Sequence, residues 1–134
     1  MKILIIDGQG GGIGKQLITA IKESSKDYSI TAVGTNSVAT GAMLKAGADS
    51  GATGENAVVV GCQNADVIIG AIGIAIANSL LGEITATMAM SVGQSNAKKL
   101  LIPMNNNRET IVGVPETPMK KVVQNVVEIL EELG

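Results

Sequence analysis

The sequence has no histidine, tryptophan or phenylalanine, and Tyr28 is its one aromatic residue. The lack of histidine excludes an imidazole general base and imidazole metal ligands within this chain. A single aromatic residue excludes a platform on which nucleic-acid bases stack. The core must therefore be built from valine, isoleucine, leucine, alanine and methionine, and no metal is expected.

Cysteine, net charge and long apolar runs are equally scarce. Cys62 is the single cysteine, expected as a buried inert thiol, so no disulfide can form within the chain. That fact and the lack of a signal-peptide pattern predict a cytoplasmic protein. The net charge of −2 predicts neither a nucleic-acid nor a membrane partner. The longest apolar stretch, 67–81, is about 15 residues long and too short to cross a bilayer.

The chain does contain alternating strand-like and helical patterns over 134 residues, with 46% hydrophobic residues and 17 glycines. We expect one α/β domain, 1–134, with a single doubly wound, mostly parallel, Rossmann-like sheet covered by helices on both faces. The expected strands are 2–6, 29–34, 66–70, 99–104 and 111–114. The expected helices are 15–25, 37–46, 53–62, 74–81, 83–92 and a last one from Thr117.

The last helix carries the clearest amphipathic pattern. Thr117 is expected to cap it, with Pro118 at its first position. Its spacing predicts one apolar stripe. The stripe consists of Met119, Val122, Val123, Val126, Ile129, Leu130 and Leu133.

A glycine-rich turn, 8–14, separates the first strand from the first helix, as a dinucleotide-binding turn does. The glycines fail G-x-G-x-x-G in every register but fit G-x-x-x-G-x-G at Gly8, Gly12 and Gly14. Gly8 would permit a sharp exit from the strand, and Gly12 would let N–H groups approach a pyrophosphate. Gly14 would let the helix pack close to the sheet, and Lys15 would add a charge near the phosphates.

This turn resembles the coenzyme turn of the short-chain dehydrogenases, in which T-G-x-x-x-G-I-G follows the first strand. Asp7 replaces the threonine here. The resemblance covers about 30 residues and implies NAD or NADP as the cofactor. The family's catalytic tyrosine and lysine, four residues apart, have no counterpart, because Ala32 lies four residues after Tyr28.

Other interpretations of the turn compete with this one. A Walker A loop fits at Gly14 and Lys15, but Gln9 replaces its first glycine and Gln16 its metal-binding hydroxyl. The S-adenosylmethionine loop needs an acid two residues before its first glycine, and Gln9 breaks that register. Another bound anion or a purely structural turn stays open, although five glycines in seven residues are costly without a close approach.

The whole chain is similar to an uncharacterised family of small bacterial proteins, a domain of unknown function. The shared stretches are ILIIDGQGGGIGKQL, GTNSVAT, MLKAGAD, GATGEN and the region from ADVIIG to LLGEIT. The resemblance implies a compact stand-alone protein and no particular activity.

Three further segments follow predicted strands. Thr35, Asn36 and Ser37 occupy the usual ribose-binding position, where an acid would favour NAD; they are neutral, so NAD and NADP both stay open. Ser37 also suits the N-cap of the next helix. The segment 70–73 suits contact with an adenosine or a nicotinamide ribose, and the segment 105–109 suits a carboxylate or a phosphate. Both also suit simple turns. The candidate cofactor-binding residues are Gly8, Gln9, Gly10, Gly11, Gly12, Ile13, Gly14, Thr35, Asn36, Ser37, Gly70, Ala71, Ile72, Gly73 and Asn105.

No catalytic residue can be assigned. The acids nearest to predicted turns are Asp7, Asp49, Glu55 and Glu83, of which Asp49 and Glu55 are candidates to meet at one sheet edge.

The leading hypothesis is a nucleotide-binding protein with a sensor or regulatory role. A minimal NAD(P)-dependent oxidoreductase and an interaction protein with a vestigial turn are the alternatives. The segment 72–81 is apolar on most sides, which suits a homodimer as well as burial.

Overall fold

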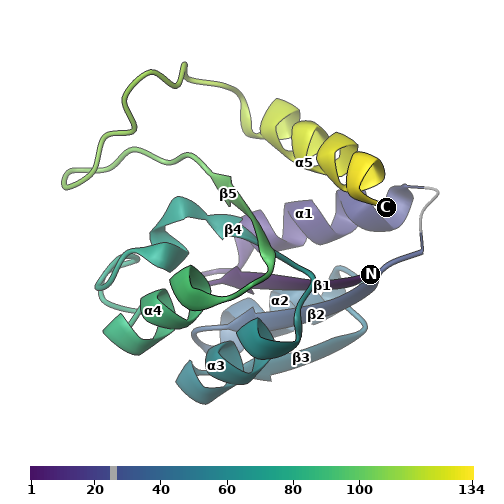
Figure 1. The fold of residues 1–134 in the computed structure, drawn as a ribbon, viewed down its shortest axis with the longest axis horizontal. Coiled ribbons are helices and arrows are strands. Elements are labelled where there is room, and N and C mark those ends of the chain that lie inside the picture. Colours follow the sequence, from purple (N-terminus) through teal and green to yellow (C-terminus); the bar gives the residue numbers. More distant parts are fainter. Residues whose placement is uncertain (25–26) are drawn as a thin grey trace.

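The computed structural model describes residues 1–24 and 27–134 and is built on one parallel sheet (Figure 1). The strands follow the order β3-β2-β1-β4-β5, and every pairing is parallel. This confirms the predicted α/β class, and the order matches the first five strands of a Rossmann-type doubly wound sheet. The strands are β1 (Lys2–Asp7), β2 (Ser29–Gly34), β3 (Ser50–Thr53), β4 (Val67–Ala71) and β5 (Lys98–Ile102).

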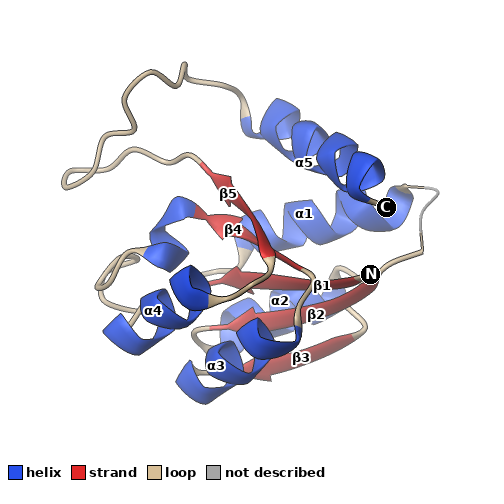
Figure 2. Ribbon diagram, in the orientation of Figure 1, coloured by secondary structure: helices blue, strands red, loops and turns tan. Residues whose placement is uncertain are grey.

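Helices cover both faces of the sheet, as expected (Figure 2). The first face carries α1 (Gly12–Glu23), α2 (Ser37–Lys45) and α5 (Met119–Leu133). The second carries α3 (Glu55–Asn64) and α4 (Ala86–Gln94). No helix within residues 1–24 and 27–134 is long and apolar enough to cross a membrane.

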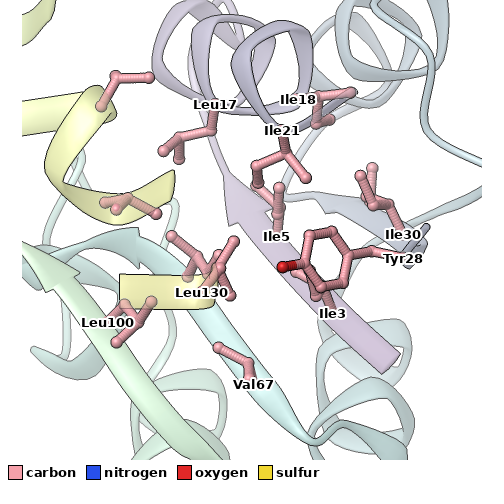
Figure 3. Packing of buried hydrophobic residues seen from close by; sticks show 14 of the residues in the cluster. Ile3, Ile5, Leu17, Ile18, Ile21, Tyr28, Ile30, Val67, Leu100 and Leu130 are labelled. Atoms are coloured by element: carbon pink, nitrogen blue, oxygen red, sulfur yellow. The ribbon is translucent and has the colours of Figure 1, made fainter. Parts of the chain in front are cut away.

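The continuous apolar run of β1 follows from this sandwich. Ile3 and Ile5 point into the core of the first face, while Leu4 and Ile6 point into that of the second. Alternate side chains of a strand face opposite sides, so a central strand with two covered faces is apolar throughout. In Figure 3, Tyr28 packs beside Ile3 and Ile5. The only aromatic ring therefore lies at the amino edge of the sheet, next to the start of β2.

Several expected elements differ in the structure. The strand β3 was not anticipated, because its sequence Ser-Gly-Ala-Thr is short, exposed and without an apolar pattern. The strand expected at 111–114 is wrong: these residues lie in the connection 103–118, where Gly113 has a φ of 82° and Val112 is exposed. The expected helix end at Ser25 lies outside the described residues, and α1 begins at Gly12 rather than at Lys15.

The helix expected at 74–81 is also wrong. Only a 3-10 turn, η1 (Ile72–Ala75), forms there, and α4 starts at Ala86 instead of at residue 83. The Ser79 hydroxyl donates to the carbonyl of Gly73 at 2.6 Å. Such a bond from a side chain to the backbone competes with the backbone hydrogen bonds of a helix. Thr85 is the N-cap of α4 and accepts from the N–H of Met88.

Two expected caps are corrected as well. Asn36, not Ser37, caps α2, because its carboxamide oxygen accepts from the N–H of Ala39 at 2.9 Å. The Thr117 hydroxyl donates to the carbonyl of Pro115 and does not cap α5. The buried side of α5 is Val123, Val126, Val127 and Leu130, whereas Ile129 and Leu133 are exposed.

Candidate functional site

The topological switch point of the sheet lies between β1 and β4. The chain builds outward from β1 through β2 to β3 and then crosses to β4 on the other side of β1. In open parallel sheets, ligands bind outside the carboxyl ends of the strands at this point. The glycine-rich turn follows β1 and η1 follows β4, so two of the segments expected to bind cofactor lie at adjacent strand ends.

Asp7 holds the turn from inside. One oxygen of its buried carboxylate accepts from the N–H of Gly8 at 2.8 Å, and the other accepts from the N–H of Gly14 at 2.7 Å. Burial raises the pKa of Asp7, although these two hydrogen bonds act in the opposite direction. Two N–H groups that the sequence offered to a phosphate are therefore already bound within the chain.

Three of the glycines are explained by contacts within the protein. A Cβ at Gly8 would lie 2.7 Å from the Thr35 hydroxyl. Gly11 has a φ of 74°, which glycine adopts readily. A Cβ at Gly14 would lie 2.5 Å from the sulfur of Met43. Gly14 therefore makes room for a side chain of α2, whereas the sequence predicted close packing of the helix on the sheet. Glycine is favoured at these positions whether or not a ligand binds.

Gly10 and Gly12 have no such explanation. A Cβ built on either one would meet no atom within 4 Å, and neither has a positive φ. Both are exposed, and Gly12 is the first residue of α1. Their N–H groups donate none of the hydrogen bonds found in the described part of the chain. The outer side of the turn is thus open to an approaching group.

Glu83 reaches the same turn from the segment before α4. Three donors share its Oε1 atom: the N–H of Gln9 at 2.9 Å, the Thr35 hydroxyl at 2.5 Å and the Asn36 carboxamide at 2.8 Å. The bonds from Thr35 and Gln9 hold the pKa of this carboxyl below its usual value. The Asn36 carboxamide also donates to the carbonyl of Gln9 at 3.0 Å. The turn and the end of β2 are therefore joined through one carboxylate.

An unusual backbone path brings Glu83 to this position. Asn78, Leu80 and Leu81 have φ values of 69°, 55° and 56°, and Gly82 follows with 88°. Such conformations cost about 1 kcal/mol or more for residues other than glycine. The side chain of Leu81 is 95% exposed at the outside of this bend. The sequence offered no signal for this arrangement, because it depends on tertiary contacts.

The other residues expected to bind the cofactor differ in burial. Gly70 and Ala71 are buried in β4, where a Cβ on Gly70 would lie 2.7 Å from the carbonyl oxygen of Ile6. Ile72 and Gly73 are half-buried in η1. Ser37 is exposed as the first residue of α2.

Asn105 belongs to the long connection that leaves β5 and extends away from the sheet (Figure 1). Its carboxamide oxygen accepts from the N–H of Ile111 at 2.8 Å. The next carboxamide oxygen, of Asn106, accepts from the N–H groups of Arg108 and Glu109. The asparagine oxygens are thus used by the turns of the connection itself.

The remaining acids and the thiol lie elsewhere. Asp49 precedes β3 and binds the N–H of Ile30, whereas Glu55 follows β3, so the expected meeting of these two acids at one edge is wrong. Cys62 is buried between α3 and α4, and burial raises its pKa to about 11. A thiol that stays protonated is a poor nucleophile, in agreement with the inert role expected for it.

Comparison with solved structures supports the fold. The chain is similar to the dodecameric FMN-dependent Ubix-like decarboxylase from Escherichia coli O157:H7, with 17% identity and a TM-score of 0.52. The match covers 100% of this chain and 95% of that one. At this identity the likeness concerns the fold alone. No curated protein matches the sequence.

Comparison with protein families assigns almost the whole chain. A single family model, described as a domain of unknown function, matches residues 2–133. This span includes the glycine-rich turn, Glu83 and the connection before α5. The chain therefore belongs to the DUF3842 family.

Proposed function

We propose that this protein binds a nucleotide cofactor of the NAD(P) type at the carboxyl edge of β1 and serves as a sensor or regulatory protein. The observation that carries the proposal is the open side of the turn at Gly10 and Gly12. A glycine costs conformational entropy, so two glycines without an internal reason favour a close approach by a ligand.

The chemistry of the open side suits a phosphate. The N–H groups of Gly10 and Gly12 are available there, and Gly12 starts α1, whose N-terminus carries a partial positive charge. Asp7 and Glu83 are negative, but Asp7 faces the inner side and bonds to Gly8 and Gly14. A phosphate would therefore bind away from Asp7, against the first turn of α1.

A regulatory role is supported by the contacts that join the glycine-rich turn to an exposed side chain at the surface. Gln9 is bonded to Glu83, and two residues before Glu83 lies the exposed Leu81. A ligand that engages the Gln9 backbone or Glu83 would shift the segment that presents Leu81. A binding event at the glycine-rich turn would thus move an exposed apolar side chain that a partner can contact.

Flavin mononucleotide is the second candidate ligand. A solved structure with a similar fold is described as FMN-dependent, and FMN carries one terminal phosphate. The only aromatic ring, Tyr28, is buried at the opposite edge of the sheet and would not stack on a flavin there. That neighbour is also a dodecamer, so we extend the proposal to self-association, which light scattering on the purified protein would test.

A thermal-shift screen tests the proposal. The panel is NAD, NADH, NADP, NADPH, FMN, ATP, coenzyme A and S-adenosylmethionine, and a ligand at about 100 times its Kd stabilises the folded state by about 2.7 kcal/mol. We expect at least one nicotinamide nucleotide or FMN to raise Tm. Gly12→Asp should abolish that shift without lowering Tm, because an acid is favourable in a first helical turn but repels a phosphate.

Gly93→Asp is the matched control. Gly93 also has no atom within 4 Å of a Cβ, but it lies in the last turn of α4. This variant should keep the ligand shift of the wild type. A screen in which no nucleotide changes Tm would contradict the proposal, as would a Gly12→Asp protein that binds normally.

A further inference from the structure

We infer that Glu83 is the ribose-binding acid of this site and that it selects a nucleotide with a free 2′-hydroxyl. The inference rests on the proposed nucleotide binding and names the ribose chemistry that the site would accept. It would make the cofactor NAD rather than NADP, a choice that the sequence left open.

The position of Glu83 is the first support. In dinucleotide-binding sheets, an acid near the end of the second strand binds the ribose 2′-hydroxyl. In this chain the end of β2 is followed by neutral Thr35 and Asn36. Glu83 lies 2.5 Å from the Thr35 hydroxyl and 2.8 Å from the Asn36 carboxamide, although 47 residues separate it from Asn36. The missing acid is thus supplied from another part of the chain.

The second support is that only half of the carboxylate is used. Oε1 accepts all three bonds, from Gln9, Thr35 and Asn36. Oε2 takes part in none of the hydrogen bonds found in residues 1–24 and 27–134, and the side chain is half-exposed. A carboxylate oxygen accepts from hydroxyl groups, and the bonds to Oε1 hold Oε2 in place before a ligand arrives.

The third support is the order of groups along the edge. The N–H of Gln9 joins Glu83 to the turn, and the open residues Gly10 and Gly12 lie within the next three positions of the chain. In a nucleotide, a ribose and a phosphate are covalent neighbours. An acceptor for ribose hydroxyls beside donors for a phosphate therefore matches the order of groups in the ligand.

The charge of Glu83 determines which ribose is accepted. A 2′-hydroxyl donates to a carboxylate, whereas a 2′-phosphate carries negative charge and has only acceptor oxygens at neutral pH. Thr35 and Asn36 add no positive charge to offset that repulsion. NADP should therefore bind more weakly than NAD at the same site.

Calorimetric titration with NAD and NADP tests this selection. We expect the wild type to bind NAD at least about tenfold more tightly than NADP, the ratio that one hydrogen bond to a charged group supports. Glu83→Gln should remove most of this ratio by weakening NAD and strengthening NADP. Glu55→Gln is the matched control: Glu55 also accepts from a hydroxyl, that of Thr85 at 2.5 Å, and its change should leave the ratio unaltered.

Each other outcome overturns the inference in a recognisable way. If Glu83→Gln weakens both nucleotides equally, Glu83 merely supports the turn; if it strengthens both, the carboxylate blocks the site. A wild type that binds FMN but neither NAD nor NADP would refute the ribose assignment and keep nucleotide binding. If the wild type binds no nucleotide, the proposed function itself is refuted. Should Glu83→Gln unfold at assay temperature, Glu83→Asp, which keeps the charge, must retain the preference for NAD.

Discussion

Two loops leave the carboxyl edge of the same sheet and are held in different ways. The glycine-rich turn after β1 has distant partners in addition to the local bonds of Asp7: Gln9 lies 74 residues from Glu83, which also binds Thr35 from 48 residues away. The connection after β5 is held locally, by hydrogen bonds that span two to six residues around Asn105 and Asn106. A loop fixed by distant elements becomes part of the folded core and can present N–H groups in one arrangement. A loop that bonds only to itself cannot.

The largest expected effect compares one glycine in each loop. Gly11 and Gly113 have φ values of 74° and 82°, but a Cβ on Gly11 would lie 2.9 Å from the backbone of Ala39, whereas Gly113 has open space. Gly11→Ala should cost about 3 kcal/mol of unfolding free energy, because a backbone clash adds to the strain. Gly113→Ala should cost about 1 kcal/mol, the strain alone. Urea unfolding of both variants measures the difference, and equal costs would refute the distinction between the loops.

A smaller difference is expected for the side chains that hold each loop. Glu83→Ala removes an acceptor shared by three donors and should lower the unfolding free energy by about 1–2 kcal/mol. Asn106→Ala removes two local bonds in an exposed turn and should change it by less than about 0.5 kcal/mol. Chemical denaturation with matched m-values checks both. An Asn106 variant as destabilised as the Glu83 variant would show that the connection is also part of the core.

The smallest effect is a pH dependence confined to the turn. The folded-state pKa of Glu83 is lowered, so its contribution to stability is present above the unfolded pKa of about 4.3 and is lost as pH falls through the folded pKa. The gap in unfolding free energy between wild type and Glu83→Gln should therefore narrow in acid. Because the carboxylate is half-exposed, the change should stay under about 1 kcal/mol.

Asp7 should behave in the opposite way. Its folded-state pKa is raised by burial, so its contribution is present below the unfolded pKa of about 3.9 and declines as pH rises through the folded pKa. Unfolding free energies measured from about pH 3 to pH 7 distinguish the contribution of Asp7, which declines as pH rises, from that of Glu83, which declines as pH falls. A gap between wild type and Glu83→Gln that widens in acid would contradict the sign derived for Glu83.

Much of the fold was predictable from local patterns. The runs 2–6 and 29–34 became β1 and β2 almost residue for residue, because a strand covered on both faces is apolar throughout. The helix predicted over 74–81 is wrong because the apolar composition of this segment does not distinguish a helix from a bend packed on the core. Its hydroxyl and carboxylate contacts, such as that of Ser79 with Gly73, decided the backbone path.

The candidate site was likewise predictable in part from local patterns. The glycine-rich turn, its place after β1 and its start of α1 at Gly12 follow from short-range composition and the strand–turn–helix order. Sequence patterns therefore predicted the fold class and the place of the glycine-rich turn at the carboxyl end of β1. The structure adds that Asp7 accepts from two N–H groups of the turn and that Glu83 lies beside the end of β2. The bonds of Asp7 reach only one and seven positions along the chain and depend on the path of the turn, whereas those of Glu83 join residues 47 to 74 positions apart and form only once the sheet has brought distant segments to one edge.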